Sequence, residues 1–140
     1  MYSYKYPRAA LTVDAIVYSK EKNGISVLLI QRGRDPFINK WALPGGFIEM
    51  DETLESACIR ELEEETGLKV QQMEKFRTYD AIDRDPRHRT ISVVFSTELE
   101  ELKKVSGSDD AINAKWFNTD KLPDLAFDHA IILNDFFKSV

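Results

Sequence analysis

The sequence predicts a layered α/β fold, in which helices cover a sheet that is buried on both faces. Residues 27–30, Val-Leu-Leu-Ile, are continuously apolar within a β-rich run, as expected of a strand covered on both sides. Residues 91–96 alternate as a strand does, whereas residues 54–66 and 127–140 carry helical patterns. A length of 140 residues with 43% apolar content predicts one domain, residues 1–140, with a substantial core.

Two strands are expected near the N-terminus, at residues 11–18 and 25–31. The Asn23-Gly24 pair between them indicates a hairpin. Residues 1–8 precede them as an aromatic and basic arm, which we expect to be a frayed terminus. Packing of this arm at a dimer interface is the less favoured alternative.

The next segment, residues 41–46, reads Trp-Ala-Leu-Pro-Gly-Gly. Pro44 restricts its neighbours, and the two glycines permit close backbone approach, which suits a turn lining a phosphate site. Pro-Gly-Gly alone is an ordinary loop in most proteins. We expect Trp41 in the core or at its rim, in preference to a base-stacking role.

The remaining elements follow from the same patterns. Cys58 is the single cysteine, which excludes an internal disulfide, suits a reducing cytoplasm and predicts a packed core thiol. Asp128 is expected to cap the C-terminal helix. We expect strands at residues 70–79, 90–99 and 115–118, a loop at 100–111 and a helix at 127–140.

The central feature of the chain is an acidic helix that precedes Gly67. Asp51 or Thr53 can cap its start, and Gly67 is placed to end it in a left-handed conformation. Four glutamates crowd its last turn, where the partial negative charge of the helix end makes each acid cost about 0.3–1 kcal/mol. These glutamates are Glu61, Glu63, Glu64 and Glu65.

Orientation separates these acids. At about 100° per residue, Glu61 and Glu65 share a face with the apolar stripe, whereas Glu63 points to solvent. Carboxylates turned toward a core need a compensating cation, and the single guanidinium of Arg60 cannot neutralise three acids. Hard oxygen ligands without nearby His or Cys favour Mg²⁺ or Mn²⁺ over zinc. A solvated acidic face is the ordinary interpretation of such a run, but the inward orientation favours a metal site.

The spacing of these residues also resembles a known family. Gly46, Glu52 and residues 60–68, Arg-Glu-Leu-Glu-Glu-Glu-Thr-Gly-Leu, match the Nudix box at every defined position. The resemblance implies a Nudix-type α/β/α sandwich with a central mixed sheet that hydrolyses a nucleoside diphosphate linked to another moiety. It implies Mg²⁺ held by Glu61, Glu64 and Glu65.

The resemblance further implies that a backbone carbonyl near Gly45 and Gly46 joins these metal ligands, and that Arg60 orients the glutamates. Gly46 is also expected to contact the substrate. Catalysis needs a carboxylate to take a proton from the attacking water. It comes from the box or from an acid of the following loop, and the sequence does not choose among Glu98, Glu100, Glu101, Asp109 and Asp110.

Cations concentrate in the loop at residues 80–89. Arg84 and Arg87 there, with Arg32, are expected to hold the diphosphate or a terminal ribose phosphate, because guanidinium forks bind phosphate bidentately. A solvated hairpin loop is the equal alternative. Residues 84–87 and 116–130 resemble the ADP-ribose branch of the Nudix family, which implies hydrolysis of ADP-ribose to AMP and ribose 5-phosphate.

Other functions remain open. One alternative is a nucleotide-pool-cleaning pyrophosphohydrolase acting on oxidised or non-standard nucleoside triphosphates. Another is a non-catalytic ADP-ribose-sensing domain, as in regulators with a following winged helix, for which a chain that ends at Val140 is expected to leave no room. A partner-binding module is the least favoured.

Bulk properties limit the partners. The net charge of −5 argues against nucleic acid, and the sequence shows no membrane span or signal peptide. We expect a cytoplasmic protein with a small nucleotide substrate. A homodimer is open, but the short N-terminal arm puts in doubt the cross-subunit adenine site of longer ADP-ribose hydrolases.

Overall fold

The structure, a computed structural model, describes residues 3–140, and strand β1 lies at the centre of its sheet. The strand order is β3-β2-β1-β6-β5, with β4 also paired to β1 and β7 to β2. The β1–β6 pair is parallel and the other pairs are antiparallel, which confirms a mixed sheet. The elements are β1 (Ala10–Glu21), β2 (Gly24–Arg32), β3 (Trp41–Ala42), β4 (Gly45–Phe47), α1 (Leu54–Thr66), β5 (Glu74–Tyr79), β6 (Thr90–Leu99), β7 (Ala111–Asn118) and α2 (His129–Lys138).

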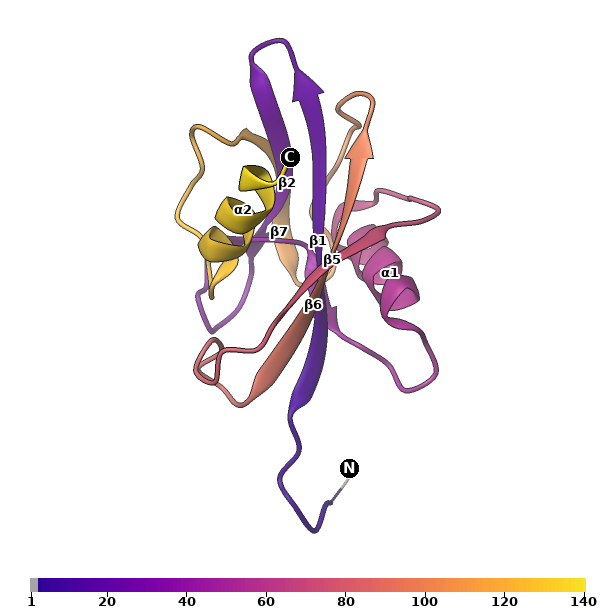
Figure 1. The fold of residues 1–140 in the computed structure, drawn as a ribbon, viewed down its shortest axis with the longest axis vertical. Coiled ribbons are helices and arrows are strands. Elements are labelled where there is room, and N and C mark those ends of the chain that lie inside the picture. The colour runs from indigo at the N-terminus through magenta and orange to yellow at the C-terminus, as the bar shows by residue number, and fades with distance from the viewer. Residues whose placement is uncertain (1–2) are drawn as a thin grey trace.

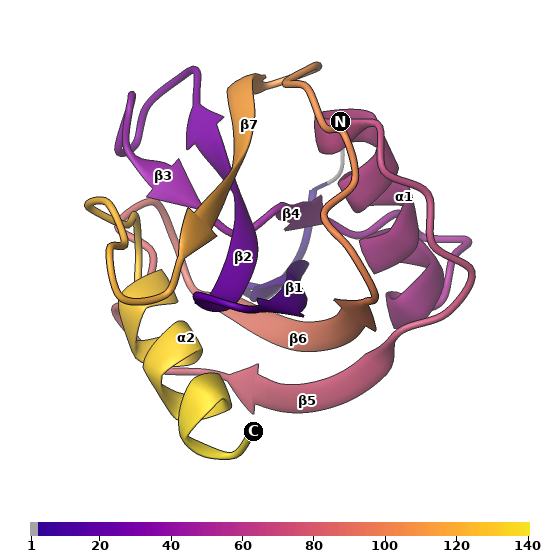
Figure 2. The same cartoon turned by 90° about the horizontal axis from the view of Figure 1, so that it is seen from above.

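The two helices cover opposite faces of the sheet (Figures 1 and 2). Alternate β1 residues face each side: Val13 and Val17 pack with α1, whereas Ile16 packs with α2. All three side chains are fully buried. The α/β/α sandwich is thereby confirmed, and its physical cause is a central strand that is apolar on both faces.

Helix α1 begins and ends as its sequence predicts. Of the two candidate caps, Thr53 is used, because its hydroxyl accepts a hydrogen bond of 3.1 Å from the backbone N–H of Ser56. Gly67 adopts φ 78° and closes the helix through a 2.8 Å bond from its N–H to the carbonyl of Glu63. Cys58 is fully buried, and burial raises the pKa of its thiol, as expected of a core cysteine.

Other boundaries differ from expectation. The strand expected at residues 70–79 starts only at Glu74, because Met73 packs under α1 and donates its N–H to Glu55 at 2.9 Å. The strand expected at 115–118 starts already at Ala111, paired with β2. Trp41 packs edge to face on Phe117 at 4.8 Å, at the rim of the core.

The start of α2 shows a further correction. Asp128 occupies the N-cap position of this helix, but its side chain makes no cap hydrogen bond. The expected side-chain cap is therefore wrong, and the carboxylate instead binds Arg84. Phe127, expected as the first helical residue, has φ 53° and lies outside the helix.

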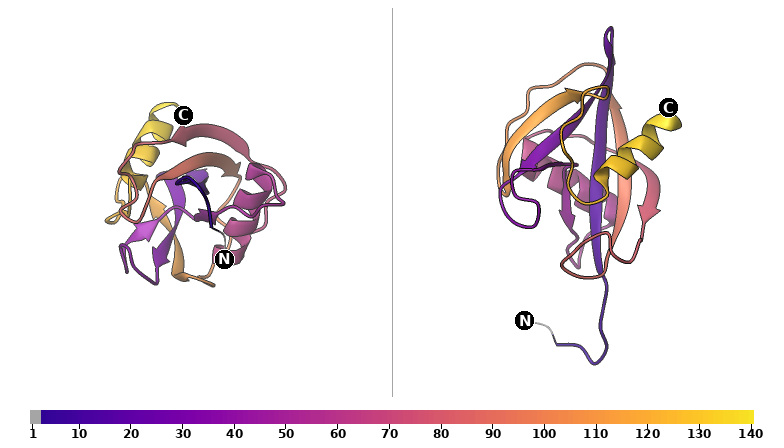
Figure 3. Two further views of the ribbon diagram at one scale, coloured as in Figure 1. Left: turned by 90° about the horizontal axis from the view of Figure 1, so that it is seen from below. Right: turned by 90° about the vertical axis from the view of Figure 1, so that its left-hand side faces the viewer.

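The N-terminal arm carries no strand where it is described. Residues 3–9 are exposed and extend away from the body of the protein (Figure 3), and residues 1–2 lie outside the described residues. Among the described helices, none has the length and apolar content needed to cross a membrane.

Candidate active site

A cleft of about 220 Å³ lies where β1, the end of β2, the β4 turn and helix α1 converge. The expected site residues that line it are Gly45, Gly46, Glu61, Glu65, Arg32, Arg84 and Arg87. Arg60 and Glu64 are not among its lining residues. One cleft thus collects expected site residues from four separate stretches of the chain.

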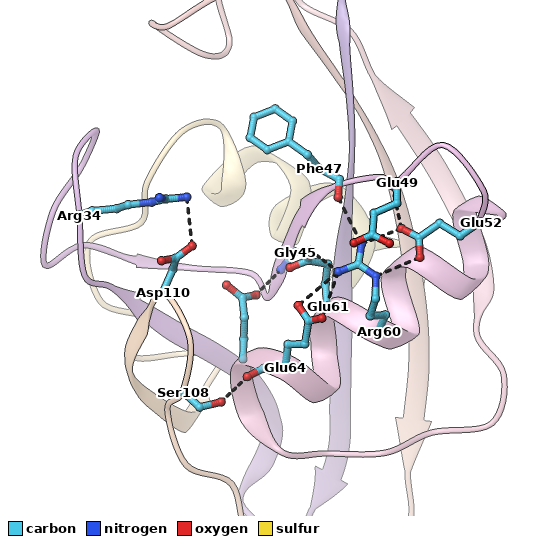
Figure 4. A network of polar contacts seen from close by, with 11 residues as sticks. Arg34, Gly45, Phe47, Glu49, Glu52, Arg60, Glu61, Glu64, Ser108 and Asp110 are labelled. Carbon is cyan, nitrogen blue, oxygen red and sulfur yellow. Dashed lines mark hydrogen bonds and ion pairs between the residues drawn. The ribbon is translucent and has the colours of Figure 1, made fainter. Parts of the chain in front are cut away.

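Arg60 ties the acidic helix to the turn before it (Figure 4). Its guanidinium binds Glu52 through two hydrogen bonds of 2.6 and 2.9 Å. A third nitrogen donates to Glu61 at 2.9 Å and to Glu64 at 3.2 Å. Bonds to Glu52, with smaller contributions from Glu61 and Glu64, raise the pKa of this guanidinium. Arg60 is thus a fixed cation that orients the acids and not a mobile surface residue.

Glu65 is the most deeply placed acid of the helix. It is 7% exposed, and burial raises the pKa of its carboxyl to about 8, with added repulsion from Glu61 and Asp14. The N–H of Gly45 donates to it at 2.7 Å and partly offsets this effect. Burial also raises the pKa of Glu61, although its bond to Arg60 opposes the change.

Gly45 and Gly46 are required here because the chain passes very close to its neighbours. Strand β4 pairs with β1, placing Gly46 opposite Val13 and Gly45 opposite Asp14. A Cβ atom on Gly46 would lie 2.6 Å from Oε2 of Glu61, and one on Gly45 would overlap the carbonyl oxygen of Val13. Gly46 therefore leaves the space that the Glu61 carboxylate occupies, and Gly45 permits the close approach of β4 to β1.

The three expected metal ligands do not share one position. Among the described residues, no group of three or more His, Cys, Asp or Glu side chains is arranged to hold a metal ion. Arg60 holds Glu61 and Glu64, and the latter is exposed on the helix surface. The donor chemistry nevertheless fits a hard divalent cation, because Glu61 and Glu65 both line the same cleft with carboxylate oxygens.

The three arginines expected to bind an anion differ in whether their guanidinium groups already pair with a carboxylate. Asp128 binds Arg84 bidentately at 2.9 and 2.7 Å, and Asp85 binds Arg87 at 3.1 and 2.8 Å. Both guanidinium forks are thus already neutralised.

Arg32 differs from both. It donates its Nε–H to the carbonyl of Pro36 at 2.7 Å, and no described carboxylate forms an ion pair with it. Burial lowers the pKa of Arg32, and repulsion from Arg87 lowers it further. Arg32 is the cation in this cleft with its terminal nitrogens available for an anion.

The loop after β6 closes the end of α1. Ser106 and Ser108 donate backbone N–H groups to the carbonyls of Thr66 and Glu65, each at 3.2 Å, and the Ser108 hydroxyl donates to the carbonyl of Glu64. These bonds satisfy carbonyls that a helix end leaves without partners. The loop thereby carries Asp109 and Asp110 to the cleft, whereas Glu98, Glu100 and Glu101 do not line it.

Asp110 binds Arg34 at 3.0 Å, so Asp109, at φ 58°, is the one of the two cleft-lining loop acids that has no ion pair among the described residues.

Sequence reasoning missed a buried polar network behind the cleft. Asp14 is 7% exposed in the middle of an apolar strand and accepts a hydrogen bond from the hydroxyl of Ser92. His129 is fully enclosed nearby, with its Nε2 3.7 Å from Asp14, and its Nδ1 accepts the N–H of Leu43 at 3.0 Å. The acid interrupting the apolar run of β1 was the available signal, but its partners are distant in the chain.

The fold and the acidic helix define a Nudix domain, and comparison with known families agrees. The NUDIX domain family matches residues 8–137, so the chain belongs to the Nudix family. It is 42% identical to an ADP-ribose pyrophosphatase of Methanocaldococcus jannaschii over 95% of this chain and 76% of that protein. It is 31% identical to an ADPR responsive transcriptional repressor of Acinetobacter baylyi, over 94% of this chain but 54% of that protein.

Solved structures agree with this assignment. A MutT/nudix family protein from Enterococcus faecalis superposes with a TM-score of 0.90 at 32% identity, over 100% of this chain and 65% of that one. The NUDIX domain of Shewanella oneidensis NrtR complexed with ADP ribose gives 0.89 at 29% identity, over 96% and 90%. A bifunctional NMN adenylyltransferase/ADP ribose pyrophosphatase from Francisella tularensis, complexed with AMP and a Mn ion, gives 0.88 at 31%, over 97% and 43%.

Proposed function

We propose that this protein hydrolyses ADP-ribose to AMP and ribose 5-phosphate in a Mg²⁺-dependent reaction. The observation that carries the proposal is a pair of carboxylates, the buried Glu65 and the half-buried Glu61, facing a cleft whose other wall holds the unpaired Arg32. Glu61 is paired with Arg60, but Glu65 forms no ion pair among the described residues, and a buried acid of this kind is costly unless a divalent ion or a proton compensates it. The similarity to ADP-ribose pyrophosphatases supports the choice of substrate.

The side chains divide the work as follows. Glu61, Glu64 and Glu65, with the carbonyl of Gly45, would hold Mg²⁺, and Mn²⁺ is the alternative that a related structure contains. A bound divalent cation supplies positive charge to the diphosphate and acidifies the attacking water.

Arg32 would bind the diphosphate, and Arg60 would hold Glu61 in place from behind. Gly46 lines the cleft beside Glu61 and would let the diphosphate approach the backbone closely. Arg84 and Arg87, each neutralised by an aspartate, would supply hydrogen-bond donors without net charge. Asp109 would accept the proton of the water; its position at the cleft without an ion-pair partner among the described residues supports this role.

A substrate panel with product identification tests the proposal. The purified protein with Mg²⁺ is offered ADP-ribose, sugar nucleotides, dinucleoside polyphosphates and oxidised nucleoside triphosphates. We expect the highest kcat/KM for ADP-ribose, with AMP and ribose 5-phosphate formed in equal amounts. Preferred turnover of an oxidised triphosphate with release of pyrophosphate would support the nucleotide-pool-cleaning alternative. The observation that favours this alternative is a 44% identity to a Proteus vulgaris 8-oxo-dGTP diphosphatase over 49% of this chain.

A sensing role is the second candidate. It is favoured by the similarity to the Acinetobacter repressor, of whose length this chain spans 54%, and to a NUDIX domain complexed with ADP ribose. Calorimetry separates it from catalysis: a sensor binds ADP-ribose and leaves it intact in Mg²⁺, whereas the enzyme converts it. We favour catalysis because Glu61, Glu64 and Glu65 are all retained in this chain.

The remaining expectations are proposals with simple tests. A net charge of −5 favours a nucleotide over nucleic acid as partner, which a gel-shift assay with duplex DNA checks. A single buried cysteine suits a cytoplasmic location, which fractionation of cells checks. Light scattering decides between a monomer and a homodimer, which the sequence leaves open.

A further inference from the structure

An aromatic and cationic layer forms one wall of the cleft, separate from the glutamates. Phe127 and Phe47 both line the cleft, the first from the start of α2 and the second from strand β4. The guanidinium of Arg32 lies over the Phe127 ring at 4.9 Å. That of Arg87 lies over the Phe127 ring at 5.7 Å and over the Phe47 ring at 5.4 Å. Arg87 therefore spans two rings from different elements.

The backbone of Phe127 indicates that this placement is specifically maintained. Its φ of 53° is a left-handed conformation that a bulky residue adopts only when its surroundings enforce it. The neighbouring residues enforce it here: Ala126 donates to the carbonyl of Trp41 at 2.8 Å, and Asp128 holds the buried Arg84. Two anchored neighbours thus fix a strained residue whose ring faces the cleft.

The part of this wall formed by Arg87 and the two rings favours a neutral planar group over an anion. Asp85 neutralises Arg87 through both oxygens, so its guanidinium contributes a flat surface and little net charge. Although burial acts to raise it, the bonds from Arg87 hold the pKa of Asp85 below its ordinary value, which keeps the pair ionised. Aromatic rings and arginine planes are the surfaces on which nucleobases stack.

Phe47 also connects this wall to the glutamates. Its carbonyl accepts a hydrogen bond from Arg60 at 3.4 Å, and Arg60 holds Glu61. Figure 4 shows the Phe47 ring pointing away from that cluster. The backbone of Phe47 therefore lies at the expected hydrolysis centre and its ring lies at the aromatic wall. This places the site for the diphosphate next to a site for the base of the same nucleotide.

We infer that Phe127, Phe47 and the Arg87 plane form an intrachain subsite for the nucleobase of the substrate. This inference rests on the proposed function and names the part of the cleft that recognises the base. In this subsite the base contacts residues of a single chain, so no second subunit is needed to bind it. The subsite takes a neutral planar base, and Arg32 lies on its border toward the diphosphate.

The test compares the two halves of the substrate. Calorimetry measures binding of AMP and of ribose 5-phosphate to the wild-type protein and to Phe127→Leu and Phe47→Leu, and steady-state kinetics measure KM and kcat for ADP-ribose. We expect each variant to weaken AMP binding and raise the KM for ADP-ribose roughly 10-fold, the scale of one base–aromatic stacking contact. Ribose 5-phosphate binding and kcat are expected to change less than about twofold.

Phe37→Leu is the matched control. Phe37 also has a positive φ, 61°, and packs against Phe127 at 4.9 Å, but it does not line the cleft. It should leave AMP binding within about twofold of wild type. Equal losses for AMP and ribose 5-phosphate, unchanged AMP binding in both cleft variants, or a wild type that does not bind AMP would each overturn the inference. A wild type that binds AMP but does not turn over ADP-ribose would reject the proposed function alone.

Discussion

Replacing Gly46 with alanine should abolish most activity while leaving the fold stable. The added Cβ would lie 2.6 Å from Oε2 of Glu61, and ordinary contact begins at about 3.4 Å. The carboxylate must therefore retreat by roughly 0.8 Å, away from its 2.9 Å bond with Arg60. Displacement of a catalytic group by about 1 Å can cost roughly 100-fold, so we expect kcat for ADP-ribose to fall about 10- to 100-fold.

The stability of the Gly46→Ala variant should change little, because the atom that must move, Oε2 of Glu61, is the end of a flexible side chain. Gly46 lies outside the left-handed region, so alanine adds no backbone strain there. Calorimetric Tm should stay within about 2 °C of wild type. Gly45→Ala is the contrasting variant, since its Cβ would meet backbone atoms, the carbonyl oxygen of Val13 and, at 3.0 Å, the Cα of Asp14. Overpacking of about 1–3 kcal/mol there should lower Tm by roughly 4–12 °C.

A double-variant cycle shows whether Gly46 acts through Glu61. Activity of Gly46→Ala, Glu61→Gln and the double variant is measured as product formed from ADP-ribose in Mg²⁺. If displacement of Glu61 is the cause, alanine at Gly46 should cost less than about twofold in the Glu61→Gln background. Additive losses, or a single variant that keeps kcat within about threefold of wild type, would refute the reasoning.

Three further predictions concern buried groups. Glu65→Ala should reduce Mg²⁺-dependent turnover at least 10-fold, and a rate within about threefold of wild type would reject its role. Asp128→Ala should destabilise the protein by about 3–5 kcal/mol in urea unfolding, because Arg84 stays buried without its partner; a loss of only about 1 kcal/mol would indicate a simple cap. Burial lowers the pKa of His129 below its ordinary 6.5, so its protonation favours the unfolded chain: the contribution of His129 to stability should be full above about pH 6.5 and fall on acidification. The difference between wild type and His129→Gln isolates this contribution from the opposite trend of Glu65, whose pKa burial raises. An equal pH dependence in the variant would contradict this. The charged groups facing this histidine are Asp14, Asp128, Arg84 and Arg32.

The acidic helix was predictable because its information is local. A glycine three residues after Glu64 ends the helix, and the period of 3.6 residues turns Glu65 toward the apolar stripe. Both features depend on residues within two turns of each other. The layered α/β fold followed in the same way from the continuous apolar run of β2, whose Leu28 and Leu29 pack on opposite faces of the sheet, in the clusters of α1 and α2.

The loop acids illustrate what was not predictable. Five candidates had equal standing in the sequence because a loop has no periodicity that orients its side chains. Hydrogen bonds from Ser106 and Ser108 to the end of α1 place the loop, and they bring Asp109 and Asp110 to the cleft. The aromatic wall was missed for a similar reason, since Phe47 and Phe127 are 80 positions apart in the chain.

Capping, periodicity and glycine placement thus suffice to specify the helix and the direction of its glutamates, and the family follows from the resemblance of these residues to the Nudix box. Pairings between distant residues select which groups reach the cleft. Asp128 shows why. A side-chain cap on the helix N–H groups would stabilise the protein by about 0.5–2 kcal/mol, whereas leaving the buried Arg84, 44 residues away, without its partner would destabilise it by about 3–5 kcal/mol. The stronger of these two interactions joins residues that are distant in the chain and leaves no local pattern, so the carboxylate binds the arginine and not the helix end.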